Sequence, residues 1–145
     1  MSLVVVGVDH SEGAKAALAF AAEEARLRGS TLRVVHAWQY GYVGYTGFEG
    51  AAPSIGVDLH TLRQAADAVL EETVQTLGDS NGVEVEKRAV EGAPSSVLIE
   101  ESRGADLLVV GSRGHGGFAQ LLLGSVSQQC ANHAECPVAI VRARA

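Results

Sequence analysis

The sequence predicts an α/β protein with a doubly wound, open sheet of parallel strands and helices on both of its faces. Residues 3–8 (LVVVGV) and 105–111 (ADLLVVG) are continuous apolar runs, typical of parallel strands that are covered on both faces. Segments of helix length separate the expected strands, and parallel strands need such crossover connections. A sheet of this kind binds ligands beyond the carboxyl ends of its strands, where the strand order reverses.

The first half of the chain continues from the strand at residues 3–8 into a helix. Ser11 is a suitable N-cap for this helix, its alanines and leucines recur at helical spacing, and Gly29 ends it. Residues 31–38 (TLRVVHAW) form the second expected strand. Residues 39–56 contain turn residues throughout and no period, so we expect a long loop. Its three tyrosines and one phenylalanine leave two interpretations open, a lid over a ligand or a disordered surface loop.

The second half repeats the alternation of helices and strands. Residues 83–90 alternate apolar and charged side chains, which predicts an edge strand with one wet face. Pro94 suits the first turn of the short helix that follows. No internal repeat or domain boundary interrupts the pattern, so we expect a single domain over residues 1–145. The elements expected here are a helix at 57–79, a strand at 83–90, a helix at 93–104, a strand at 105–111, a helix at 125–135 and a strand at 137–143.

Composition and charge argue against several classes of function. The chain has 145 residues, a hydrophobic content of 47% and a formal net charge of −6 at pH 7. This content supplies a sizeable core, and the negative charge disfavours a general nucleic-acid binder because phosphate backbones attract basic surfaces. No stretch reaches transmembrane length, and the first residues lack the basic start of a signal peptide. We therefore expect a cytoplasmic protein with neither nucleic acid nor a membrane as its partner.

Cysteines and histidines give only weak signals for a metal site. Cys130 and Cys136 are too few for a disulfide framework, and we interpret them as buried structural thiols. His10, His36 and His115 fall near one edge of the expected sheet, but no pair has the short spacing typical of metal ligands. We therefore expect no metal held by the protein alone.

Residues 111–127 (GSRGHGGFAQLLLGSVS) concentrate glycines between a strand and the last helix. Such a loop can expose N–H groups in a concave nest that suits anions, and the helix that begins at GSVS offers further N–H groups to a phosphate. Ser125 and Ser127 can add hydroxyl hydrogen bonds. If the first and fourth strands are neighbours, Asp9 lies beside this loop and can accept from ribose hydroxyls or hold Mg²⁺ against the phosphates. The alternative is a mobile connecting loop without a ligand.

Three better-known motifs do not fit this stretch. A Walker A loop needs Gly-Lys-Ser/Thr, which occurs nowhere in the chain. The dinucleotide fingerprint GxGxxG belongs after the first strand, where GVDHSEG does not supply it. The nucleophile elbow GxSxG lacks its closing glycine in GSVS.

The spacing of the glycines and three further segments carry a family resemblance. Gly111, Gly114 and Gly124-Ser125 follow the pattern Gly-x2-Gly-x9-Gly-Ser with a nine-residue spacer. VVVGVDHSEGAKAAL, LRVVHAW and CPVAIVR are similar to a first strand with its helix, a second strand and a last strand of the same family. In these features the chain resembles the nucleotide-binding branch of the universal stress proteins over essentially its whole length. The resemblance implies a Rossmann-like sheet in the order 3-2-1-4-5.

The resemblance also implies a site for an adenine nucleotide and a dimer. In the family, the turn after the first strand contacts the nucleoside, the end of the second strand touches the adenine, and the glycine loop with its helix holds ribose and phosphates. Family members commonly dimerise through the last strand, here Pro137 to Arg142, although its apolar alternation is equally typical of an ordinary edge strand. The site residues that carry over are Gly7, Val8, Asp9, Ala37, Val110, Gly111, Arg113, Gly114, Gly124, Ser125, Val126 and Ser127.

We expect an adenine-nucleotide-binding stress-response protein in which ATP, with or without Mg²⁺, controls a regulatory homodimer. The sequence shows no evident group that activates water, so no catalytic residue is assigned and any hydrolysis is expected to be slow. Two alternatives stay open, a nucleotide-free interaction module on the same fold and a slow ATP hydrolase. The choice among ATP, AMP and a cyclic nucleotide also stays open.

Overall fold

The computed structural model describes residues 2–9, 11–39, 58–112 and 123–143. Residues 40–57, which hold nearly all of the expected loop or lid, lie outside this part of the chain. The predicted alternation of strands and helices is confirmed. In chain order the elements are β1 (Leu3–Gly7), α1 (Glu12–Arg28), β2 (Thr31–Trp38), α2 (Leu59–Gln75), β3 (Val85–Glu91), α3 (Pro94–Glu101), β4 (Leu107–Gly111), α4 (Ser125–His133) and β5 (Val138–Val141).

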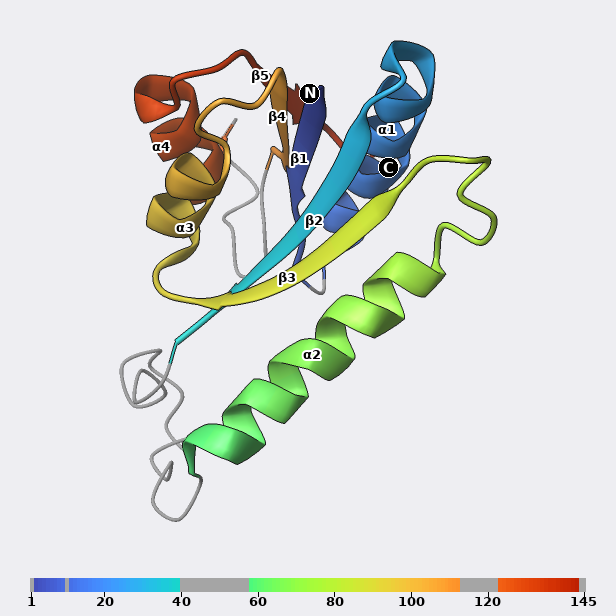
Figure 1. The fold of residues 1–145 in the computed structure, drawn as a ribbon. Helices are drawn as coiled ribbons and strands as arrows, with labels where there is room; N and C mark the ends of the chain where they lie inside the picture. The colour runs from blue at the N-terminus through green and yellow to red at the C-terminus, as the bar shows by residue number, and fades with distance from the viewer. Residues whose placement is uncertain (1, 10, 40–57, 113–122, 144–145) are drawn as a thin grey trace.

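The strands of the described chain form one parallel, five-stranded sheet in the order β3-β2-β1-β4-β5. This confirms the doubly wound arrangement and the strand order. Helices α1 and α2 cover one face, and α3 and α4 cover the other (Figure 1). The chain leaves β1 toward α1 on one face and leaves the adjacent β4 toward α4 on the opposite face. The point where the strand order reverses therefore lies between β1 and β4, and their carboxyl ends are the place to look for a site.

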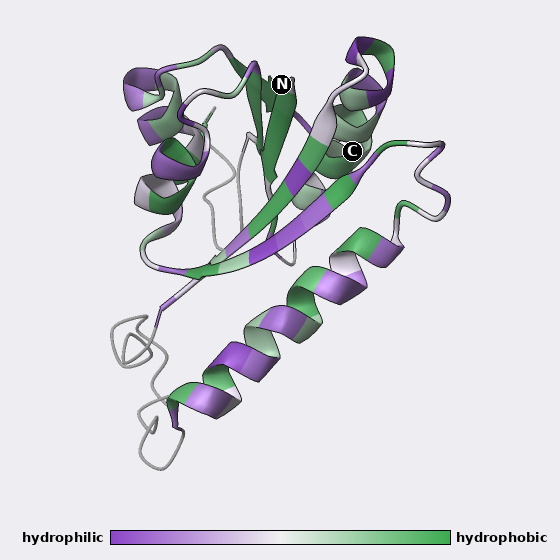
Figure 2. Ribbon diagram, viewed as in Figure 1, coloured by the Kyte–Doolittle hydropathy of each residue, from purple (hydrophilic) through white to green (hydrophobic). Residues whose placement is uncertain are grey.

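Each face of the sheet carries its own apolar core, and β1 contributes to both. Val4 and Val6 pack against α1, whereas Val5 packs on the α3 and α4 side, and all three have no exposed surface. The alternation follows from the two-residue period of a strand, which sends successive side chains to opposite faces. Figure 2 shows β1 and β4 as apolar along their lengths, as the continuous β-branched runs predict.

Helix α1 begins and ends where the sequence indicates. The N-cap Ser11 accepts a hydrogen bond from the backbone N–H of Ala14, which satisfies one of the free donors of the first turn. At the other end, Gly29 adopts a left-handed conformation with φ of 65° and donates its N–H to carbonyls of the last turn. Small side chains at Ala17 and Ala21 are fully buried, so the helix axis can lie close to the sheet.

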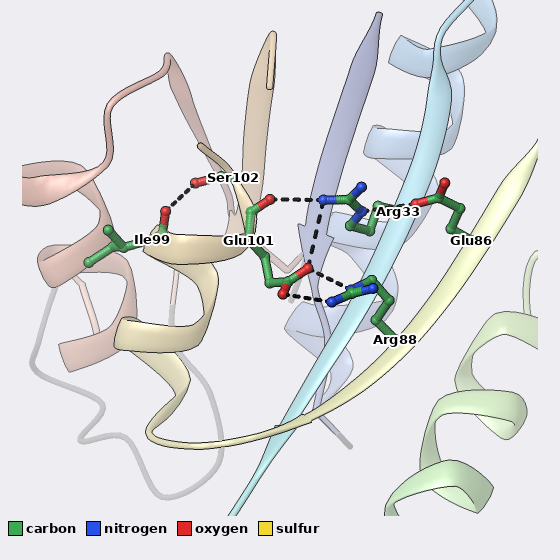
Figure 3. A network of polar contacts seen from close by, with 6 residues as sticks. All are labelled: Arg33, Glu86, Arg88, Ile99, Glu101 and Ser102. Atoms are coloured by element: carbon green, nitrogen blue, oxygen red, sulfur yellow. Dashed lines mark hydrogen bonds and ion pairs between the residues drawn. The ribbon is translucent and has the colours of Figure 1, made fainter. Parts of the chain in front are cut away.

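Strand β3 is an edge strand, as predicted, and charged side chains cover its surface on the α3 side. Arg88 donates to both carboxylate oxygens of Glu101, at 2.7 Å and 3.1 Å, which raises the pKa of its guanidinium (Figure 3). Arg33 on β2 donates to Glu86 at 2.9 Å and to the Glu101 carbonyl oxygen at 3.1 Å. The Glu101 side chain is only 12% exposed. The network ties β2 and β3 to the last turn of α3.

Turns shorten several of the expected elements. Strand β3 begins at Val85 rather than at residue 83, because the N–H of Val83 bonds to the Ser80 carbonyl across a turn. Asn81 and Gly82 in that turn have positive φ values of 54° and 84°, which no strand adopts. Helix α4 ends at His133 rather than at residue 135 because the backbone of the next residue is extended. Within the described part of the chain, no helix combines the length and apolar content needed to cross a membrane.

Candidate functional site

The carboxyl ends of β1 and β4 bring two of the segments implied as site residues together. The two strands pair directly, and α1 starts just beyond the end of β1. The first turn of α1 touches the last residue of β4: a Cβ placed on Gly111 would lie 3.1 Å from the carbonyl oxygen of Gly13. The turn after β1 and the end of β4 therefore form one continuous surface where the strand order reverses.

Hydrogen bonds to β2 hold the turn after β1. The N–H of Val8 donates to the Val35 carbonyl at 2.9 Å, and the Val8 carbonyl lies 3.0 Å from Nδ1 of His36. Val8 itself is 6% exposed and belongs to the core on the α1 side. Both of its peptide groups are thus anchored on the neighbouring strand, which fixes the direction in which the chain leaves the sheet.

Asp9 follows directly and is half-buried at the edge of the sheet. Its Oδ1 accepts two hydrogen bonds from Ser11, one from the backbone N–H at 2.8 Å and one from Oγ at 2.5 Å. We predicted Ser11 only as a helix cap, so this second contact was missed. The signal was present in the spacing Asp-x-Ser, because an aspartate often accepts from the N–H two residues further on.

Helix α4 begins at Ser125 beside the end of β4, and its N-cap residue, Gly124, has no side chain that could cap it. The N-cap Gly124 has an extended backbone, with φ of −82° and ψ of 174°, and donates its N–H to the Ser112 carbonyl at 2.6 Å. The first N–H groups of a helix have no intrahelical partner, and the helix dipole adds positive potential there. This end of α4 is therefore suited to an anion.

The two serines at the start of α4 differ in what they offer. Ser125 is exposed at the first helical position. Ser127 is 1% exposed, and its hydroxyl donates to the Ser112 carbonyl at 2.8 Å and lies 3.1 Å from the Gly124 carbonyl. The Ser127 hydroxyl therefore ties α4 to the end of β4, a role that the sequence did not indicate.

Four other residues in the implied site are packed into the molecule. A Cβ on Gly7 would lie 2.5 Å from Cδ1 of Leu98, so close packing under α3 accounts for this glycine. Val110 is 2% exposed and belongs to the core on the α3 and α4 side, and the partly buried Ala37 and Val126 pack against that core. Arg113 and Gly114 lie outside the described residues, as do His10 and His115.

The thiols and the remaining histidine have structural surroundings. Cys130 is fully buried, and burial raises the pKa of its thiol to about 11. The pKa of the partly buried Cys136 is also raised by burial. These surroundings fit the interpretation of both as structural thiols. In residues 2–9, 11–39, 58–112 and 123–143, no group of three or more histidine, cysteine and carboxylate side chains could hold a metal ion.

Similar proteins of known sequence match almost the whole chain. A universal stress protein of Mycolicibacterium smegmatis is 35% identical over 142 residues, which are 97% of this chain and 46% of that protein. A universal stress protein of Thermus aquaticus is 34% identical over 143 residues, 96% of this chain and 97% of that protein. The chain thus spans about half the length of the first curated relatives it matches and nearly all of the Thermus protein.

Similar solved structures include complexes with adenine nucleotides. A universal stress protein in complex with cAMP is 28% identical with a TM-score of 0.72, covering 99% of this chain and 98% of its own. The protein from Archaeoglobus fulgidus in complex with dAMP is 26% identical with a TM-score of 0.69, covering 97% and 98%. A family protein from Arabidopsis thaliana with AMP bound is 26% identical with a TM-score of 0.66, covering 100% and 94%.

The sequence pattern, the strand order and these comparisons agree. The family model described as the universal stress protein family matches residues 1–142. This chain belongs to the universal stress protein family.

Proposed function

We propose that this chain is a single nucleotide-binding domain that takes up an adenine nucleotide at the carboxyl ends of β1 and β4, with ATP as the first candidate. The observation that carries the proposal is that α4, whose N-cap is a glycine, starts beyond the end of β4, and the neighbouring strand β1 leads into the Asp9 turn at the point where the strand order reverses. The cAMP, dAMP and AMP complexes of similar proteins support adenine as the base. In this role the nucleotide acts as a ligand that controls a regulatory dimer in a stress response.

Two groups of described residues are proposed to contact the two ends of the ligand, the ribose and the phosphates. Asp9, in the turn that follows the buried Val8, accepts a hydrogen bond from the ribose. The backbone N–H groups of Ser125 and Val126 meet the phosphates at the start of α4. Arg113 and Gly114 stay proposed phosphate contacts on the resemblance alone. If Mg²⁺ accompanies a triphosphate, the carboxylate of Asp9 is a suitable ligand for it, because Mg²⁺ binds oxygen ligands.

Ser125→Pro tests the phosphate end without disturbing the helix. Proline is favoured at the first helical position, and the extended backbone of Gly124 is the conformation that a residue before proline prefers. The substitution removes one N–H that faces the proposed phosphate and also the hydroxyl. Ser125→Ala is the matched control, because it removes the hydroxyl alone.

Calorimetric titration of nucleotide-stripped protein with ATP, AMP, cAMP and adenosine gives the measurement. Micromolar ATP binding, about −8 kcal/mol, is the expected wild-type result. Loss of one hydrogen bond to a charged group weakens binding by about 1.5–3 kcal/mol, so Ser125→Pro is expected to lower ATP affinity by at least tenfold. Its adenosine affinity is expected to stay close to wild type. Folded wild-type protein that binds none of the four ligands would overturn the proposal in favour of the nucleotide-free interaction module.

The dimer is proposed through β5, which lies at the edge of the sheet with all four residues partly exposed. The carbonyl of Pro137 accepts from Leu108 of β4, and that of Val141 accepts from Ser112 just beyond β4. The alternation of a strand therefore turns the main-chain groups of Ile140 toward the free edge. Ile140→Pro removes an N–H from that edge and leaves the β4 ladder intact. We expect light scattering to show a wild-type dimer and an Ile140→Pro monomer, with Ile140→Ala as the control for the lost side chain.

A further inference from the structure

We infer that Ser11 is a positioning residue for Asp9, which holds the carboxylate in the orientation that accepts from a ribose hydroxyl. The inference rests on the proposed function, because it assigns a partner to the residue proposed to contact the ribose. It adds the N-cap residue of α1, which itself touches no ligand. Ser11 acts on binding only through the orientation of Asp9.

Both hydrogen bonds from Ser11 end on the same carboxylate oxygen of Asp9. The backbone N–H lies 2.8 Å from Oδ1 and the hydroxyl lies 2.5 Å from it. Two donors on one oxygen fix the side-chain torsions of Asp9 and direct Oδ2 away from Ser11. No donor among the described residues contacts Oδ2. One oxygen is therefore used to orient the group, and the other can accept from a ligand.

The hydroxyl of Ser11 is itself held in place by α1. It accepts from the backbone N–H of Ala14 at 3.0 Å, so its own hydrogen is left to donate to Asp9. Ala14 is 4% exposed and packs in the core on the α1 side. On the other side of the turn, Val8 is anchored on β2. Asp9 thus lies between two residues fixed to the scaffold, which reduces the cost of ordering it when a ligand binds.

Ser11→Gly removes the hydroxyl while keeping a residue that serves well as an N-cap. The backbone bond to Oδ1 remains, so the carboxylate is loosened rather than released. We expect adenosine and ATP affinities to fall by the same factor, about 5- to 20-fold, since both carry the ribose and a hydrogen bond to a charged group is lost. Ser11→Thr keeps the hydroxyl and is expected to restore binding to within about 3-fold of wild type.

A control separates this effect from a weaker α1. Ala19 is an exposed residue in the interior of α1, and Ala19→Gly destabilises the helix without touching the turn. Calorimetric titration with adenosine is expected to give a wild-type dissociation constant for Ala19→Gly. Weakening by Ala19→Gly equal to that of Ser11→Gly would overturn the inference, because loss of helix stability would then account for both.

Asp9→Ala completes the test as a double-mutant cycle. We expect Ser11→Gly to have no further effect on adenosine affinity once Asp9 is alanine. If Ser11→Gly weakens adenosine binding just as much when Asp9 is alanine, the inference is overturned. It is also overturned if Asp9→Ala binds adenosine weakly while Ser11→Gly keeps the wild-type affinity. Both outcomes leave the proposed nucleotide site standing. Wild-type protein that binds neither adenosine nor ATP would instead remove the proposed function and this inference with it.

Discussion

Replacing Gly7 with alanine is expected to destabilise the protein through a clash under α3. The added Cβ would lie 2.5 Å from Cδ1 of Leu98, 2.9 Å from its Cδ2 and 3.2 Å from its Cγ. Leu98 is 5% exposed and packs with the fully buried Val5 and Leu108. It therefore has little room to move aside. The resemblance assigns Gly7 to the nucleoside contact, so this variant separates a packing role from a ligand role.

The expected loss of stability can be worked out from the crowding around the new Cβ and from the space that a smaller residue at position 98 would leave. Overpacking a dense core costs about 1–3 kcal/mol, and we expect Gly7→Ala to lose about 2 kcal/mol of unfolding free energy. Leu98→Ala alone should cost about 2–5 kcal/mol, because it leaves a cavity. In that background the new methyl group enters the cavity, and its burial contributes about 0.8 kcal/mol. The double variant should therefore be about 2–3 kcal/mol more stable than the sum of the two single losses predicts.

Urea unfolding of the ligand-free protein, followed by circular dichroism, measures all four free energies. The slopes against urea concentration should agree, so that differences in midpoint report stability. Gly111→Ala is the matched comparison, since its Cβ would meet the backbone of Gly13 rather than a side chain. Leu98→Ala should not relieve that substitution. A coupling between Gly7→Ala and Leu98→Ala below about 0.5 kcal/mol would refute the packing explanation.

Three further outcomes are expected. Glu101→Ala should lower the free energy of unfolding in urea by about 1–3 kcal/mol, because Arg88 loses both of its carboxylate acceptors and Arg33 loses an ion pair at 3.7 Å. The exposed Glu100→Ala on the same helix should change it by less than about 0.5 kcal/mol. Burial raises the pKa of the Cys130 thiol from 9.0 to about 11, so the unfolded state loses this proton first as pH rises. The protonated thiol therefore contributes about 2–3 kcal/mol to the free energy of unfolding below pH 9, and this contribution is lost as pH rises to about 11. Between pH 9 and pH 11 the free energy of unfolding should fall less steeply in Cys130→Ala than in the wild type. Equal slopes in the two proteins would contradict the raised pKa of Cys130. Ser127→Ala should cost about 1 kcal/mol in thermal unfolding, because the hydroxyl that ties α4 to β4 is gone, and an unchanged midpoint would count against that tie.

Local pattern was sufficient to predict the alternation of strands and helices in a doubly wound parallel sheet, whereas the strand order came from the family resemblance. The β-branched run at residues 3–8 predicts a strand without reference to the rest of the chain, and its composition predicts burial on both faces. The alternating charges of residues 83–90 predicted the edge position of β3 in the same way. The caps Ser11 and Gly29 act within one helical turn, so their signal is also local.

The roles of individual glycines could not be predicted in this way. The glycines at 7 and 111 were both assigned to the ligand on the resemblance, yet each also meets a segment remote in sequence. Gly7 lies against Leu98 of α3, and Gly111 lies against Gly13 of α1. Such contacts depend on how closely a helix approaches the sheet, and nothing in the neighbouring residues encodes that distance. The same holds for Ser127, whose partner Ser112 lies 15 residues earlier in the sequence.

The two described segments of the proposed site are anchored before any ligand arrives. Val8 bonds to β2 through both its N–H and its carbonyl group, and Gly124 bonds through its N–H to the Ser112 carbonyl beyond β4. Groups held in this way lose little conformational freedom on binding, so more of the interaction energy appears as affinity. Loosening an anchor should therefore weaken binding even when every atom that contacts the ligand is retained. That consequence links the stability of the scaffold to the affinity of the site, and it is the reason why Ser11, which touches no ligand, is expected to matter as much as a residue that does.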